Sequence, residues 1–173
     1  DKVTVRVTVD GKIQVTNALV QTAGVTNFNA DQIRQIAIVV DDPNATTGTV
    51  TISTVGLSYT PVISTTTTNA LTNLGGAAIS AMEPAGVNTV TSFSQTGTGA
   101  ASFTYNLAAG TGNNRWAGSL ISFPSNFNLT TQNLVISASD GSGSSYYKLE
   151  LIDAQGDKVT VRVTVDGKIQ VTN

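Results

Sequence analysis

The chain begins and ends with the same segment. The seventeen residues DKVTVRVTVDGKIQVTN occupy positions 1–17 and recur letter for letter at positions 157–173, which is 156 residues later. In the first part of the segment, valines alternate with polar residues, and this period of two is typical of a strand with one buried face. Identity over the whole segment is far beyond chance. Any fold for this chain must therefore accommodate two equal strand-forming segments.

Each copy of the segment is expected to form a β-hairpin. A two-residue Asp-Gly loop would set Val163 opposite the polar Gln170, whereas a three-residue loop sets it opposite Ile169. Because the longer loop puts both apolar sets on one face, we predict this loop, with Gly167 left-handed at a G1 bulge. The first copy is predicted to turn in the same way at Gly11.

Composition narrows the classes of function. The chain has neither Cys nor His, which excludes thiol nucleophiles, disulfides, Cys/His zinc sites and His-dependent triads. Its net charge of −2, with no basic patch, argues against nucleic-acid binding. The longest apolar runs, such as IAIVV at 36–40, are far shorter than the roughly 20 residues of a membrane helix. We therefore expect no membrane insertion. The abundance of Thr, Ser, Asn, Val and Gly resembles that of secreted surface proteins, so an extracellular or cell-surface location is expected.

Short segments with strand character recur along the whole chain. No long helix is predicted, but 29–35 is expected to form one helical turn capped by Asn29. A Thr-rich stretch at 60–76 is expected to be a linker, and Pro124 is expected to end its strand. Many short strands at this spacing predict an all-β sandwich. The predicted strands are 35–42, 49–59, 88–97, 99–110, 115–124, 133–141 and 145–156.

The order of these pieces resembles a known family once the two halves are exchanged. The stretches NRWAGSLISFP, SSYYKLELIDAQG and FNADQIRQIAIVVDDPNATTGTVTISTVGL, read in that order, resemble a galactose-binding-like jelly roll of the carbohydrate-binding-module type. The resemblance implies a jelly-roll β-sandwich present as two half-repeats in permuted order. Residues 1–64 would be the C-terminal half of one repeat, and 65–156 the N-terminal half of the next, with 65–76 as linker. Residues 157–173 would then repeat the opening hairpin.

The duplicate segment suggests how such units could assemble. One sandwich can use one hairpin, so the other would keep an uncovered valine face and unpaired edges, which recruit other chains. We therefore predict donor-strand complementation between units in a tandem or head-to-tail array of the chain with itself. This would make the protein a structural repeat of an extracellular filament or long adhesin. The alternative is that the chain merely overruns one repeat by a hairpin. The residues expected to carry assembly are the apolar positions Val3, Val5, Val7, Ile13, Val15, Val159, Val161, Val163, Ile169 and Val171.

Carbohydrate binding is the second functional hypothesis. Sugar sites combine an exposed aromatic face with a few polar groups, and Trp116, the only Trp, follows Arg115 directly. Tyr146 is expected to point away from the core if Tyr147 points inward. The competing interpretation, which we favour for Trp116, is that its ring fills the core of the sandwich. Surface glycans are thus candidate partners through Arg115, Trp116 and Tyr146.

Metal binding and catalysis are weaker hypotheses. The resemblance implies a structural calcium ion held partly by an Asp of the final strand, but Ser53 and Thr54 stand at that point. Asp41, Asp42 and Asn44 offer oxygen ligands suited to Ca²⁺, although the same residues are typical of a turn, which we favour.

The carboxylates Glu150 and Asp153 could be imagined as a hydrolytic pair. A solvated strand face is the favoured interpretation, because Glu150 alternates outward with Lys148. We therefore expect no enzymatic activity and no cofactor other than a calcium ion.

Overall fold

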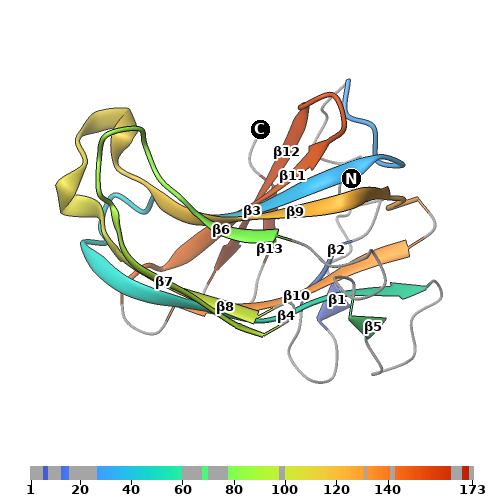
Figure 1. The fold of residues 1–173 in the computed structure, drawn as a ribbon, viewed down its shortest axis with the longest axis horizontal. Coiled ribbons are helices and arrows are strands. Elements are labelled where there is room, and N and C mark those ends of the chain that lie inside the picture. The colour runs from blue at the N-terminus through green and yellow to red at the C-terminus, as the bar shows by residue number, and fades with distance from the viewer. Residues whose placement is uncertain are drawn as a thin grey trace.

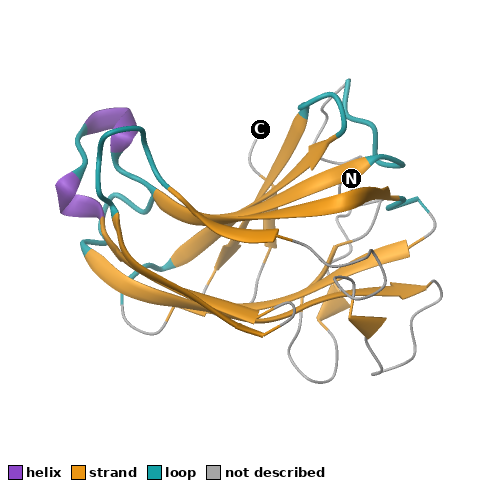
Figure 2. Ribbon diagram, viewed as in Figure 1, coloured by secondary structure: helices purple, strands orange, loops and turns teal. Residues whose placement is uncertain are grey.

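The computed structural model describes residues 6–7, 13–15, 27–59, 68–69, 78–97, 100–130, 132–140, 143–164 and 169–171. Within these ranges the chain forms two antiparallel sheets, accompanied by two short 3₁₀ turns, η1 (Leu107–Ala109) and η2 (Gly112–Asn114) (Figure 2). The prediction of an all-β fold is confirmed. Among the described residues, no helix is long and apolar enough to span a membrane.

The strands are arranged in two layers, one sheet above the other (Figure 1). The seven-stranded sheet has the order β1 (Arg6–Val7), β2 (Ile13–Val15), β10 (Gln132–Asp140), β4 (Thr47–Tyr59), β8 (Ala100–Asn106) and β7 (Val90–Gly97), with β5 (Thr68–Asn69) paired to β4. The six-stranded sheet has the order β13 (Ile169–Val171), β12 (Lys158–Thr164), β11 (Tyr146–Asp153), β3 (Ile33–Val40), β9 (Ala117–Phe127) and β6 (Ala78–Met82).

The core lies between the two sheets and follows from strand alternation. In β11, half-buried and buried residues alternate without a break, as the apolar positions of the sequence predicted. One row of buried side chains crosses five strands of the six-stranded sheet in register, through Val159, Leu151, Ile36, Ile121 and Ile79. The seven-stranded sheet adds the large buried rings of Phe103 and Tyr105 to the same cluster.

Both copies of the repeated segment form the predicted hairpin register. Val7 pairs with Ile13 in the first copy, and Val163 pairs with Ile169 in the second. Val161 likewise pairs with Val171. The register of a three-residue loop is therefore confirmed in each copy. The loop glycines Gly11 and Gly167, and the assembly candidates Val3 and Val5, lie outside the described residues.

The two hairpins occupy different sheets. In the first copy, β2 pairs with β10 at the end of the seven-stranded sheet, while in the second, β12 pairs with β11 at the end of the six-stranded sheet. In this structure the two copies therefore occupy two positions, whereas the sequence-based expectation gave the sandwich a place for one hairpin only. A sandwich of two open sheets has two edges on the same side, and each hairpin extends one of them.

Three local expectations differ from the structure. Residues 29–32 form a single turn, closed by the hydrogen bond from Gln32 N to Asn29 O (3.0 Å), and β3 begins already at Ile33. The burial of Ile33 in the core outweighs any helical tendency there. Pro124 does not end β9, because the strand passes it at a register irregularity, where a missing amide hydrogen is tolerated.

Two segments extend the predicted strand set. Strand β6 is built from small and mixed residues, AISAM, whose alternation is weak. Within the predicted linker 60–76, Thr68–Asn69 pairs with β4 as β5. The rest of that linker, including the predicted half-repeat boundary after residue 64, lies outside the described residues.

Candidate binding pocket

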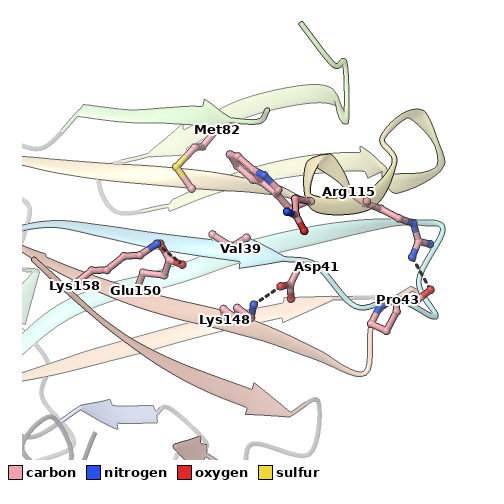
Figure 3. Close-up of a pocket in the computed structure, with 11 residues that line it drawn as sticks. Val39, Asp41, Pro43, Met82, Arg115, Lys148, Glu150 and Lys158 are labelled. Carbon is pink, nitrogen blue, oxygen red and sulfur yellow. Dashed lines mark hydrogen bonds and ion pairs between the residues drawn. The ribbon is translucent and has the colours of Figure 1, made fainter. Parts of the chain in front are cut away.

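A pocket of about 560 Å³ opens on the face of the six-stranded sheet that points away from the core (Figure 3). Residues from β6, β3, β11 and β12 line it, together with the turn after β3 and the segment from η2 to β9. The lining residues are Val39, Asp41, Pro43, Met82, Gly112, Asn113, Arg115, Trp116, Lys148, Glu150 and Lys158.

The floor of the pocket is one register row of the sheet. Met82, Gly118, Val39 and Lys148 are consecutive neighbours on four adjacent strands. Gly118 leaves the middle of this row without a side chain, and a Cβ there would meet the carbonyl oxygen of Ile38 at 2.6 Å. The close approach of β9 to β3 therefore requires glycine at this position.

One wall of the pocket comes from the segment that joins η2 to β9. Trp116 is half-buried and lines the pocket, so the expectation that its ring fills the core is wrong. Its carbonyl oxygen accepts a hydrogen bond from the hydroxyl of the buried Thr89 (2.7 Å), which fixes the start of β9. This hydrogen bond therefore fixes the backbone that carries the Trp116 indole.

Arg115 ties this wall to the turn that follows β3. Its guanidinium donates hydrogen bonds to the carbonyl oxygens of Pro43 (2.6 Å) and Ala45 (2.5 Å). The planar fork of donors suits two neighbouring carbonyl groups. Arg115 thus lines the pocket, but much of its hydrogen-bonding capacity holds the turn in position.

Two ion pairs supply four of the charged groups of the pocket. Lys148 pairs with Asp41, and Lys158 pairs with Glu150 at 3.2 Å (Figure 3). Lys148 and Asp41 have side chains 26% exposed, so this pair is partly withdrawn from water. Within the part of the chain that the structure describes, Asp41 Oδ1 is buried without a hydrogen-bond partner. The pocket therefore offers charged donors and acceptors beside the apolar Val39 and Met82.

Tyr146 lies on the same strand as Lys148 but does not line the pocket. The guanidinium of Arg162 sits over its ring, 4.0 Å from the centroid, in a cation–π contact. Burial raises the pKa of the Tyr146 phenol, and the negative charge of Asp41 raises that pKa further. The hydroxyl is thus protonated at neutral pH and remains a hydrogen-bond donor.

Two of the calcium candidates, Asp41 and Asp42, are engaged by different parts of the protein. Asp42 is buried, and its Oδ2 accepts hydrogen bonds from Ser145 N (2.9 Å), Ser145 Oγ (2.7 Å) and Ser144 Oγ (3.3 Å). Its Oδ1 accepts one from Asn44 N (2.9 Å). Burial acts to raise the pKa of Asp42, but these hydrogen bonds outweigh it and hold the pKa below the ordinary 3.8.

The calcium site itself stays a prediction. Asp41 instead pairs with Lys148, and the side chain of Asn44 is exposed. Among the described residues, no group of three or more His, Cys, Asp or Glu side chains converges on a metal-sized site.

Glu150 and Asp153 lie on opposite faces of β11. Glu150 points outward to Lys158, whereas Asp153 is buried and accepts hydrogen bonds from Asn29 N (2.8 Å) and Gln155 N (2.9 Å). Asp153 therefore fixes the β11–β12 turn against the start of β3. These two carboxylates do not form a pair.

The sequence analysis named Arg115 and Trp116 as sugar-contact candidates and Asp41 only as a calcium candidate. It did not connect Met82, Lys148 and Lys158 with them as parts of one pocket. The alternation in β11 marks Lys148 as outward-facing, yet nothing local indicates that β6 lies two strands from β3. That proximity is a property of the sheet order. No protein-family model, curated protein or solved structure significantly matches this chain.

Proposed function

We propose that the pocket binds carbohydrate and that the chain is a non-catalytic glycan-binding unit of the jelly-roll type. The observation that carries this proposal is the half-buried Trp116 in the wall of a pocket of about 560 Å³. Sugar rings stack on aromatic faces, because the C–H groups of the ring meet the π-electrons there. The volume lies within the usual range of small-ligand sites.

The polar groups around Trp116 suit sugar hydroxyls. Lys148 and Lys158 can donate hydrogen bonds, and Asp41 and Glu150 can accept them. A sugar hydroxyl can therefore both accept and donate a hydrogen bond in the pocket. Because each pocket carboxylate is paired with a lysine, the arrangement favours binding over turnover.

A glycan array followed by calorimetric titration of the best hits tests the proposal. Trp116→Ala is expected to weaken binding about tenfold or more, and Trp116→Phe to retain part of the affinity because a stacking face remains. Asn113 lines the pocket whereas its neighbour Asn114 does not, so Asn113→Ala and Asn114→Ala form a matched pair. The Asn114 variant should bind like the parent. A parent protein that binds no glycan on the array would refute the proposal.

A second function is favoured by one specific observation, the identity of residues 1–17 and 157–173. We propose that the unit belongs to a tandem array in an extracellular filament or adhesin stalk, in which units contact one another. The outermost strands β1 and β13 end the two sheets, so their outer main-chain groups are the candidates for strand addition between units. Mass measurement of the intact polypeptide in its source would reveal multiples of the 156-residue period. Electron micrographs showing isolated globules at high concentration would count against assembly.

A further inference from the structure

The repeated segment contains two strands, and each is present twice in the sandwich because the segment is present twice. One occurrence is an inner strand, which pairs with β10 or β11, and the other is an outer strand at the end of a sheet. The first strand of the segment is inner as β12, which pairs with β11 over seven residue pairs, and outer as β1. The second strand is inner as β2, which pairs with β10, and outer as β13, which pairs with β12. The two inner strands therefore come from different copies.

Both inner strands lie on the same side of the sandwich. At the opposite side of the sandwich, β6 and β7 are the last strands of their sheets and contact each other. The strand orders given above therefore both start at the side of the repeated segments and finish at the side of β6 and β7. Strands β10 and β11 lie in different sheets, and only five residues separate them in the chain, so the chain reverses its direction between them (Figure 1). Because β2 is antiparallel to β10 and β12 is antiparallel to β11, β2 and β12 also run in opposite directions.

One copy of the segment is long enough to supply both inner strands. Strand β12 ends at Thr164 and β13 begins at Ile169. Thr164 lies opposite Tyr146, whereas Ile13 lies opposite Ile136, so the connection must move along the strands as well as between sheets that are about 10 Å apart. Five residue steps span up to about 17 Å, which covers both displacements when the connection is nearly fully extended. The connection can thus cross from one sheet to the other. A strand that follows β12 across this connection must run in the direction opposite to β12, and β2 runs in that direction.

We propose that the edge of β10 is an acceptor site for residues 169–171 of the same chain, which can take the position of β2. The 17-residue segment then forms an arch, with one strand in each sheet, and a single copy completes both sheets. Ile169–Val171 has the same sequence as Ile13–Val15, so the backbone pairing and the side chains presented to β10 are the same. The two segments exclude each other at this edge. The inference is independent of glycan binding.

A proline pair in the full chain tests the proposal by thermal melting. Gln14 is the central residue of β2, and Gln170 is its counterpart in the second copy. A proline cannot join the main-chain ladder, so each change removes one candidate strand from β10. Each single variant, Gln14→Pro or Gln170→Pro, should shift the Tm by less than about 3 °C because the other copy remains. The double variant should lose about 10 °C or more. Additive losses, or unfolding of Gln14→Pro by itself, would overturn the proposal.

Disulfide trapping identifies the occupant of the edge directly, since the chain contains no native cysteine. Val135 pairs with Gln14, so Val135→Cys with Gln14→Cys is the positive control for an occupied edge. Val135→Cys with Gln170→Cys reports the arch, and it should cross-link within the chain once Ile13→Pro disables β2. Absence of that link would refute the arch. Cross-linked dimers would refute the same-chain assignment, because they place the strand in a second copy.

Discussion

At the scale of single residues, the turn after β3 sends its side chains in different directions. Asp41 faces the pocket and pairs with Lys148, while Asp42 is buried and holds the loop before β11. Arg115 binds two carbonyl groups of the same turn from across the pocket. One five-residue stretch thereby joins the rim of the pocket to the core, so its residues should influence both stability and binding.

Replacement of Arg115 should show this coupling. Arg115→Ala removes hydrogen bonds to the carbonyl oxygens of Pro43 and Ala45, and Ala45 is buried, so unfolding should become about 1–3 kcal/mol easier. Glycan affinity should fall as well. Arg115→Lys should restore little, because an ammonium group cannot reproduce the planar fork. Urea unfolding followed by Trp fluorescence measures the change. An unaltered midpoint in Arg115→Ala would contradict the anchoring role.

Asp42 should make stability depend on pH in the acid range. Its pKa in the folded protein lies below the ordinary 3.8, so its contribution is present above that value and is lost as the pH falls through the folded pKa. Asp42→Asn should therefore be less stable than the parent by about 1–3 kcal/mol at pH 7, with the gap narrowing below pH 3.8. Denaturant titrations from pH 7 to about 2.5 measure it. A gap that stays constant over that range would exclude the ionised carboxylate as its cause.

At the scale of strands, the sequence predicts pairing better than it predicts boundaries. The hairpin register followed from setting Val163 opposite Ile169, since apolar residues must share a face. The end of β9 could not be predicted from Pro124, because proline is tolerated where the ladder is already irregular. The candidate site was predicted in part. Arg115 and Trp116 have a local signal, but Met82 joins them through sheet order, which no local pattern encodes.

The contact between β3 and β9 should depend on Gly118. In Gly118→Ala the added carbon would meet the backbone oxygen of Ile38 at 2.6 Å, and backbone cannot give way as a flexible side chain can. We expect a loss of about 1–3 kcal/mol of stability together with a distorted pocket floor. Ser125→Ala, an exposed position of the same strand, is the matched control and should change stability little. Thermal melts compare the two variants. Equal melting temperatures for Gly118→Ala and Ser125→Ala would show that β9 can move away from β3 without a loss of stability.

At the scale of the whole molecule, the proposed arch changes which residues make up one complete repeat unit. If one copy of the segment supplies a strand to each sheet, the 156-residue period contains every inner strand of the sandwich. The surplus strands β1 and β13 are then additions at the two outer edges. Units of an array would be joined through the chain, with edge-to-edge contacts as a separate and weaker means of cohesion.

A permuted chain tests this definition of the unit. Residues 65–173 followed directly by 18–64 contain one copy of the segment and equal one 156-residue period. We expect this chain to fold as a monomer with a Tm close to that of the parent, because it retains each inner strand and loses only two short edge strands. Light scattering and calorimetry measure both quantities. The control is the same permuted chain with Gln170→Pro, which removes the strand from the edge of β10 and should melt earlier and aggregate. If the permuted chain assembled into oligomers while its control stayed monomeric, the second strand would be acting between molecules, and the period would not be a complete unit.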